Sequence, residues 1–179
     1  MDSTRFERLL APHRVAALAF ARCLCRSRAD GDDLFQVALI RAFDHLVGLR
    51  DDGAFRPWLY RIIVTSHRNS LRRSFWRRLV PIGDDDPGAP AGGERVDDAL
   101  GGAQRASLAL ATLPPEQREA IVLFEIDGWT VEEIAEVQQC SVSAVKSRLS
   151  RGRDRLRHVY VHRLGGVAPA ALPVPEGMS

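Results

Sequence analysis

Residues 128 to 157, GWTVEEIAEVQQCSVSAVKSRLSRGRDRLR, decide the fold of the second half of this chain. Thr130 followed by Glu133 matches a capping box, in which each side chain accepts a hydrogen bond from the other residue's backbone N–H. This pattern predicts a short helix from Val131 to about Gln138. After a brief turn, apolar residues recur at helical spacing from Val142 onward and predict a second helix with one face packed inward. Two helices joined by such a turn form a helix-turn-helix motif.

The second helix of this motif carries dense positive charge. Six cations lie between Lys146 and Arg157, although the formal net charge of the chain is only +2. The apolar stripe of this helix consists of Val142, Val145, Leu149, Leu156 and Val159. If that stripe is buried, the donors that must project are Lys146, Ser147, Arg148, Arg151 and Arg155. A basic helix face can simply be solvated, but the capped first helix, the turn length and the clustered donors together favour insertion into the major groove of DNA.

Charge is distributed in three blocks along the chain. Residues 54–79 contain seven arginines and no carboxylate, and the basic helix holds its six cations against Asp154 alone. Between these blocks, residues 81–102 hold six glycines, three prolines, five aspartates and one glutamate, too little apolar surface to offset chain entropy. We expect a flexible acidic linker there. Two separated basic surfaces favour a nucleic acid over a small acidic substrate as the partner.

The ordered parts of the sequence show helical periodicity throughout, so the predicted fold class is all-α, with two small helical domains. The expected division is a three-helix unit at 1–80, the linker at 81–102, a helix-turn-helix unit at 103–163, and a disordered tail rich in proline and alanine at 164–179.

Three helices are predicted in the first domain. After Pro12, a helical pattern continues through Val15, Leu18, Ala19 and Arg22. A second helix is expected over residues 30–46, with Asp32 and Asp33 in its first turn, where they complement the helix dipole. The third helix is expected to start near Pro57, and its inward stripe consists of Leu59, Ile62, Ile63, Ser66 and Leu71.

Two further helices are predicted ahead of the helix-turn-helix motif. The first covers Gln104 to Thr112, and the second begins at the proline pair Pro114 and Pro115 and ends at Gly128. The apolar face of the second consists of Ile121, Leu123, Phe124 and Ile126.

Composition excludes several classes of protein. The longest apolar run, Val15 to Ala21, is too short to span a bilayer, and the N-terminus lacks the order of a secretory signal, so we expect a cytoplasmic chain without membrane insertion. Three cysteines, Cys23, Cys25 and Cys140, suit neither a disulfide framework nor a structural zinc site, and reduced thiols are expected.

The motifs of both domains resemble those of the extracytoplasmic-function (ECF) sigma factors, the small two-domain specificity subunits of bacterial RNA polymerase. Residues 128–157 are similar to region 4 of that family. DDLFQVALIRAF (residues 32–43), followed by AFRPWLYRIIVTSHRNSLRR (residues 54–73), is similar to regions 2.2 to 2.4. The resemblance covers most of the chain. It implies a promoter-specificity factor without catalytic residues, metal or cofactor.

The resemblance implies binding roles in the first domain. In the family, the helix matched by residues 32–43 docks on the clamp helices of the largest polymerase subunit, which implies core-polymerase contacts by Asp33, Gln36 and Arg41. Val37 stands where a glutamate is usual. The next helix opens the minus-ten element and holds an extruded base, which requires cations for the backbone and planar groups for stacking. The implied minus-ten residues are Arg56, Trp58, Tyr60, Arg61, Thr65, Arg68, Asn69, Arg72 and Arg73. Trp58 and Tyr60 are equally explained as core residues.

Region 4 of the family docks on the beta flap of the polymerase and reads the minus-thirty-five element. The implied contacts are Ser143, Lys146, Ser147, Arg148, Arg151 and Arg155, the last of them on phosphate. Gln139 occupies a turn position where glycine is common, and a left-handed backbone there would cost on the order of 1 kcal/mol. Sequestration by an anti-sigma factor is common in the family, so such a partner is also implied.

Two other functions fit parts of the sequence. A dimeric helix-turn-helix regulator would bind palindromic DNA without core polymerase. A nuclease would need clustered carboxylates held in a fixed geometry, but the only tight cluster, Asp84 to Asp86, falls in the predicted linker. The sequence favours the promoter-specificity factor over both.

Overall fold

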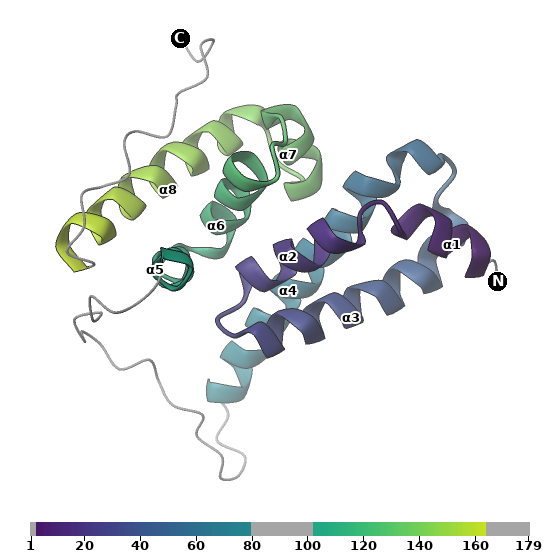
Figure 1. Ribbon diagram of the computed structural model, residues 1–179, viewed down its shortest axis with the longest axis horizontal. Coiled ribbons are helices and arrows are strands. Elements are labelled where there is room, and N and C mark those ends of the chain that lie inside the picture. The colour runs from purple at the N-terminus through teal and green to yellow at the C-terminus, as the bar shows by residue number, and fades with distance from the viewer. Residues whose placement is uncertain (1–2, 80–101, 164–179) are drawn as a thin grey trace.

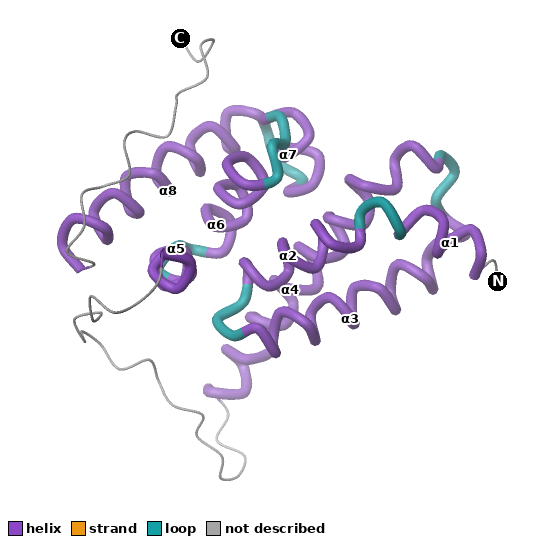
Figure 2. Tube along the Cα trace, in the orientation of Figure 1, coloured by secondary structure: helices purple, strands orange, loops and turns teal. Residues whose placement is uncertain are grey.

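The structure, a computed structural model, describes residues 3–79 and 102–163, and every regular element within these two ranges is a helix (Figures 1 and 2). The predicted all-α fold class is therefore confirmed. In chain order the elements are α1 (Ser3–Leu10), α2 (Arg14–Leu24), α3 (Arg28–His45), η1 (Leu46–Gly48), η2 (Asp52–Ala54), α4 (Phe55–Leu79), α5 (Gly102–Ala111), α6 (Pro115–Ile121), η3 (Val122–Ile126), α7 (Val131–Gln138) and α8 (Val142–Arg163). The predicted tail at 164–179 and the predicted linker at 81–102, except Gly102, lie outside the described residues.

Helices α1 to α4 form a first bundle, in which one side of α2 is buried and the other is exposed. Val15 is 82% exposed, and the buried positions of α2 are Ala17, Phe20, Ala21 and Leu24. Both faces have helical spacing, but the small alanines let α3 approach closely. Gly31 of α3 is in such close contact with α2 that an added Cβ would lie 2.5 Å from the Cα of Arg22.

Helix α3 begins at Arg28, two residues before the sequence prediction. Ser27 caps it, because the Ser27 hydroxyl accepts a hydrogen bond of 3.1 Å from the backbone N–H of Asp30. Asp30 is thus the carboxylate of the first turn, and the prediction that placed Asp32 and Asp33 there is wrong. Asp32 instead accepts a 2.6 Å bond from Nε of Arg22, which ties α3 to α2.

Helix α4 is continuous from Phe55 to Leu79 and supplies the core with Leu59, Ile63 and Ser66, as predicted. Leu71 is 41% exposed, so its predicted inward position is wrong. The last part of α4 extends past the turn that joins α2 to α3 (Figure 1), and its aromatic residues Phe75 and Trp76 are exposed.

In the second bundle, α5 to α8, helix α6 starts at Pro115 and runs into η3, a π-helical turn. The backbone N–H of Asp127 donates to the carbonyl of Val122 at 3.1 Å, five residues back. The apolar face was predicted from α-helical spacing. A π-helical turn contains more residues than an α-helical turn, so the side chains that follow it point in other directions. Ile126 is therefore 59% exposed rather than buried. Gly128, with φ of 68°, ends the segment as expected.

The helix-turn-helix motif forms as predicted. Thr130 and Glu133 make both bonds of the capping box at the start of α7. Gln139 ends α7 in the left-handed region, with φ of 52° and ψ of 53°. Gly152 lets α8 approach α6, since an added Cβ would lie 2.9 Å from Cγ1 of Ile121.

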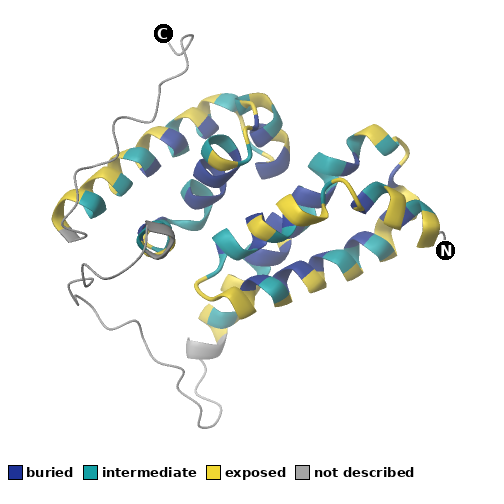
Figure 3. Ribbon diagram, viewed as in Figure 1, coloured by how far each residue is buried: buried dark blue, intermediate teal, exposed yellow. Residues whose placement is uncertain are grey.

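The two bundles pack against each other, with α2 and α4 of the first facing α6 and α7 of the second. Their buried apolar residues form one continuous cluster (Figure 3). Within the described ranges, no helix combines the length and the apolar character needed to cross a bilayer.

Candidate nucleic-acid interface

The amino-terminal half of α8 presents the predicted minus-thirty-five residues on one side. Val145 and Leu149 are fully buried against the rest of the second bundle, so the opposite side of α8 faces outward. Four residues of the predicted set are exposed on the outward side: Ser143, Lys146, Arg151 and Arg155. This arrangement leaves three cations available to a DNA groove or its phosphates.

The remaining two residues of the predicted set are half-buried. Ser147 is partly covered, and Arg148 turns back toward the end of α7. Nη1 of Arg148 donates to Oε1 of Gln138 at 2.8 Å and lies 3.0 Å from Sγ of Cys140. In this conformation the guanidinium of Arg148 braces the turn between the two helices of the motif.

The predicted minus-ten residues differ in their surroundings along α4. Thr65, Arg72 and Arg73 are exposed, and Asn69 is half-buried and accepts a 3.0 Å bond from Nη2 of Arg72. Arg61 is also half-buried, and its Nε has no hydrogen-bond partner among the described atoms. These residues lie on one side of the helix and form a polar surface on the first bundle.

Three other members of the set lie against the second bundle. The guanidinium of Arg56 stacks over the Trp129 ring, with Cζ 4.0 Å from the ring centroid. The ring of Tyr60 packs on the same tryptophan, with centroids 4.7 Å apart. Burial, followed by the charge of Asp127, raises the pKa of Tyr60. Tyr60 is 1% exposed, so of its two sequence explanations the structure shows the core position.

The third of these residues, Arg68, binds a buried carboxylate. Both nitrogens of its fork donate to Glu119 of α6, and Nε of Arg68 lies 3.1 Å from Oε1 of Glu119. Glu119 is completely buried and also accepts a 2.8 Å bond from Nε2 of Gln138. Burial raises the pKa of Glu119, but neighbouring His67, Arg68 and Gln138 lower it by more, so the net shift is downward. Glu119 is therefore an ionised group within the protein interior.

Trp58 and the loop before α4 complete the predicted minus-ten region. Trp58 is half-buried and packs on Phe55, with ring centroids 5.8 Å apart. The loop is held against α1, because Arg5 donates to Asp52 at 2.7 Å and Arg8 donates to it at 2.9 Å. The hydrogen bond from Arg5 is the main reason that the pKa of Asp52 is lowered. The start of α4 is thus fixed to the body of the first bundle.

The predicted polymerase-binding residues lie along α3. Asp33 and Gln36 are exposed, whereas Arg41 is half-buried and donates a 3.0 Å bond to the hydroxyl of Ser66. Two apolar residues of the same helix, Val37 and Ile40, are exposed to 44% and 62%. The exposed part of α3 is consequently a mixed polar and apolar surface, the composition that protein interfaces use.

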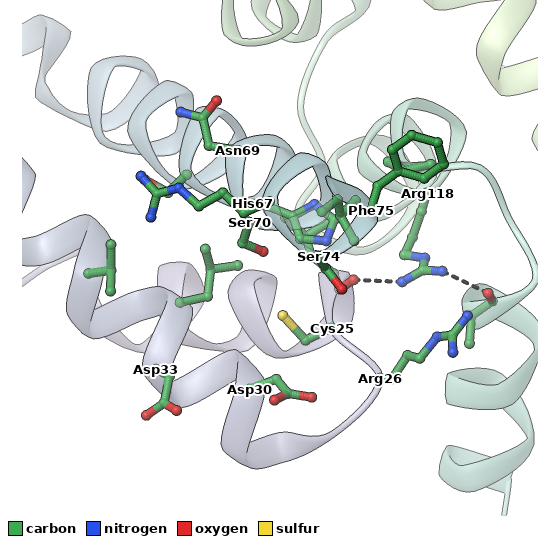
Figure 4. A pocket seen from close by; sticks show the side chains of 18 of the residues that line it. Cys25, Arg26, Asp30, Asp33, His67, Asn69, Ser70, Ser74, Phe75 and Arg118 are labelled. Atoms are coloured by element: carbon green, nitrogen blue, oxygen red, sulfur yellow. Dashed lines mark hydrogen bonds between the residues drawn. The ribbon is translucent and has the colours of Figure 1, made fainter. Parts of the chain in front are cut away.

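A pocket of about 690 Å³ opens between the bundles. Asp30 and Asp33 line it from α3, Ser70 and Ser74 from α4, and Arg118 from α6 (Figure 4). Arg118 closes one end, where it donates to the carbonyl of Leu24 at 2.6 Å. Cys25 also lines the pocket, and burial, with Asp30, raises the pKa of its thiol to about 11. The thiol is protonated at neutral pH and is a poor nucleophile.

Sequence reasoning missed the residues that join the two bundles: Arg118, Glu119, Trp129 and Gln138. One signal was present. Arg118 and Glu119 are charged residues immediately before the apolar run Ala120 to Phe124, and a charged residue that is drawn into a core needs a partner there. The sequence alone does not identify the partner of either Arg118 or Glu119.

Comparison with known protein families matches both halves of the chain. Residues 9–77 match the model of sigma-70 region 2, and residues 103–156 match the model of sigma-70 region 4.

Individual relatives span most of the chain. It is 32% identical over 166 residues to the ECF RNA polymerase sigma factor SigM of Mycobacterium tuberculosis, covering 93% of this chain and 82% of that protein. It is 33% identical over 158 residues to the ECF RNA polymerase sigma-E factor of Escherichia coli, covering 80% of this chain and 79% of that protein.

Solved structures agree with these matches. The sigma factor RpoE in complex with the anti-sigma factor NepR, from Bartonella quintana, superposes with a TM-score of 0.68 at 27% identity and covers 88% of this chain and 97% of that one. CnrH, in complex with the cytosolic domain of CnrY, gives 0.62 at 29% identity, with 87% of each chain covered. The chain therefore belongs to the ECF family of RNA polymerase sigma factors, which direct core polymerase to specific promoters and so initiate transcription.

Proposed function

We propose that the two bundles divide promoter recognition between them. The α5–α8 bundle reads the minus-thirty-five duplex with α8, and the α1–α4 bundle melts the minus-ten element and holds its non-template strand along α4. The observation that carries this proposal is the helix-turn-helix, whose second helix exposes Lys146, Arg151 and Arg155 on the side away from the core.

Polymerase binding is assigned to α3 of the first bundle and to the second bundle's contact with the beta flap. Asp33 and Gln36 are exposed beside Val37 and Ile40, so the surface of α3 offers both hydrogen bonds and apolar area to the clamp helices. The chain acts in the cytoplasm and has no catalytic group of its own, since the polymerase supplies the chemistry.

An anti-sigma factor completes the proposed set of partners. One similar structure contains the sigma factor RpoE bound to the anti-sigma factor NepR, and another contains CnrH bound to the cytosolic domain of CnrY. The pocket between the bundles of this chain, with exposed Leu71 and Phe75 at its rim, is where we place such a contact.

In vitro transcription with purified core polymerase tests the proposed function. On a pool of genomic promoter fragments, the full chain is expected to produce transcripts that start at a small set of promoters and are absent with core polymerase alone. Binding to palindromic DNA in the absence of polymerase, without any stimulated transcript, would contradict the proposal and favour the dimeric regulator.

A further inference from the structure

We propose that Arg148 is a positioning residue of the helix-turn-helix: it fixes the turn between α7 and α8 and does not itself contact the minus-thirty-five element. This inference deepens the proposed function and rests on it, because it assumes that α8 reads promoter DNA. Lys146 and Arg151 contact the DNA, and Arg148 sets the angle at which α8 presents them. The turn brace is defined as Arg148 with its two acceptors, Gln138 and Cys140.

Arg148 stands at the edge of the buried stripe of α8. It follows Val145 by three positions and precedes Leu149 by one, and both of these side chains are fully buried. Residues three apart are neighbours on the surface of a helix, so the stem of Arg148 starts beside the core. Arg148 is half-buried, whereas Lys146 and Arg151 are exposed. From this edge the guanidinium of Arg148 reaches back toward the end of α7.

A single nitrogen of Arg148 serves both acceptors of the turn brace. Its Nη1 donates to Oε1 of Gln138 at 2.8 Å and lies 3.0 Å from Sγ of Cys140. Each Nη of a guanidinium carries two hydrogens, so it can donate to two acceptors at once. Gln138 is the last residue of α7, and Cys140 stands two residues before the start of α8. The turn brace therefore fixes the end of α7 and the turn itself to the second helix.

The orientation of the Gln138 amide is determined by its other partners. Its Nε2 donates to Oε2 of Glu119 at 2.8 Å and to the carbonyl of Glu116 at 2.9 Å. An ionised carboxylate and a carbonyl only accept hydrogen bonds, so the amide nitrogen faces them and Oε1 faces a donor. Gln138 is 2% exposed, so Arg148, and not bulk water, supplies that donor. Turning Arg148 toward DNA would leave a buried amide oxygen without a partner, which is unfavourable.

The backbone of the turn is not relaxed, which is why a brace matters there. Gln139 is left-handed, with φ of 52° and ψ of 53°, a conformation that is unfavourable for a residue with a Cβ. The start of α8 is stabilised by Ser141, whose hydroxyl accepts a 3.2 Å bond from the backbone N–H of Ala144. That bond is local to α8. Arg148 adds a contact that spans the turn, from α8 to the end of α7.

A change in the angle of the turn affects every DNA contact of α8 at once. Ser143, Lys146 and Arg151 lie on one helix, so a rotation of that helix moves all three relative to the bases. Hydrogen bonds to base edges weaken steeply when their distances and angles depart from the optimum. Loss of the turn brace is therefore expected to lower discrimination at several base pairs, whereas loss of a base contact lowers it at one.

The test compares Arg148→Met with wild type, each as the full chain assembled with core polymerase, on a promoter selected in the transcription assay. Methionine keeps an apolar stem and removes the charge and the donors. Affinity is measured for that promoter and for its single base-pair variants across the minus-thirty-five element, at several salt concentrations. We expect an affinity about five- to tenfold lower and reduced discrimination at several base pairs. The slope of log affinity against log salt is expected to keep its wild-type value, because no phosphate contact is lost.

Arg155→Met is the matched comparison. Arg155 is an exposed cation of the same helix that the family resemblance assigns to phosphate. Its removal is expected to weaken binding to all the duplexes alike and to reduce the salt slope by about 0.9. A reduction of that size in Arg148→Met would show that Arg148 contacts a phosphate, and discrimination lost at one base pair alone would show that it contacts a base. Either result would overturn the inference.

Arg148→Lys keeps the charge, and it decides the question if circular dichroism shows that Arg148→Met is unfolded. Lysine ends in one nitrogen on a shorter side chain, so it is not expected to reach both acceptors, and discrimination is expected to fall as in Arg148→Met. Wild-type affinity and discrimination in Arg148→Lys would show that charge alone suffices and would overturn the inference. A wild-type chain that selects no promoter would overturn the proposed function and this inference with it, whereas the contrary results above, in a chain that does select promoters, overturn the role of Arg148 alone.

Discussion

At the scale of single residues, this sigma factor keeps an ionised carboxylate inside its interior. Glu119 is surrounded by donors from both bundles: Arg68 on one side and Gln138 on the other. Removing one partner of a buried ion pair leaves an uncompensated charge, which destabilises a protein more than loss of an exposed pair. Glu119 is thus the residue through which stability and the contact between bundles are coupled.

The pKa of Glu119 makes that coupling depend on pH. Burial raises this pKa, but His67, Arg68 and Gln138 lower it by more, so it lies below its ordinary value of 4.5. A group whose pKa is depressed by folding stabilises the protein above its unfolded pKa, and this contribution is lost as the pH falls through the folded pKa. We expect the difference in free energy of unfolding between wild type and Glu119→Gln to be complete at neutral pH and to shrink below about pH 4.5, as urea titrations at several pH values will measure. A difference that does not vary with pH would contradict this assignment.

Gln139 is a second residue whose replacement has a defined outcome. Its backbone is left-handed, with φ of 52°, a conformation that costs a residue with a Cβ on the order of 1 kcal/mol. Gln139→Gly is therefore expected to raise the free energy of unfolding by about 0.5–1 kcal/mol in urea titrations. Gly128, with φ of 68°, allows the reverse substitution as a control. Gly128→Ala is expected to lower the free energy of unfolding by a similar amount. A loss of stability in Gln139→Gly would show that its side chain matters more than its backbone.

At the scale of elements, local patterns in the sequence predicted α7 and its turn correctly but do not indicate which face of α2 is buried. The capping box and the left-handed turn depend on residues within a few positions of each other, so the sequence contains all the information they need. Alanines on both sides of α2 make two faces nearly equivalent in hydrophobicity. The choice between them depends on where α3 can approach, and the absence of a side chain at Gly31 allows a close approach beside Arg22.

The α2–α3 contact can be tested through Gly31. A Cβ at this position would lie 2.5 Å from the Cα of Arg22, a backbone atom that cannot rotate away. Although alanine is the better helix former by about 1 kcal/mol, the clash is expected to dominate and Gly31→Ala to destabilise the chain by about 1–3 kcal/mol. Gly48 has no atom within 4 Å of an added Cβ, so Gly48→Ala is the matched control and is expected to leave the thermal midpoint nearly unchanged. Equal midpoints for both variants would contradict the described packing.

Helix α8 gives the element-scale test of promoter reading. Lys146→Ala and Arg151→Ala remove exposed cations from the proposed DNA-facing side, and each is expected to reduce transcription from the selected promoters about five- to tenfold. The control is Arg157→Ala, because Arg157 is an exposed cation of the same helix that pairs with Asp154 at 2.9 Å and lies outside the proposed set. A control as damaging as the two variants would show that general charge, and not position, determines activity.

At the scale of the whole molecule, the sequence predicted two helical units and their basic surfaces but not their mutual packing. Arg68 and Glu119 lie far apart in sequence and in different bundles, and no local pattern relates them. The sequence indicates Arg68 only as a cation for DNA, because charge alone does not reveal an internal partner. Contacts of this kind are a property of the tertiary structure.

The distance between the bundles, before and after polymerase binds, tests most directly whether each bundle reads its own promoter element. Fluorophores can be attached at Val47 and Ser150, which are exposed positions on the first and second bundles. We expect efficient energy transfer in the free chain, where the bundles are in contact, and a large loss of transfer when core polymerase and promoter DNA are added, because two promoter elements two helical turns apart lie about 70 Å from each other. Transfer that stays at its free-chain value in the transcribing complex would contradict the claim that the two bundles read separate promoter elements.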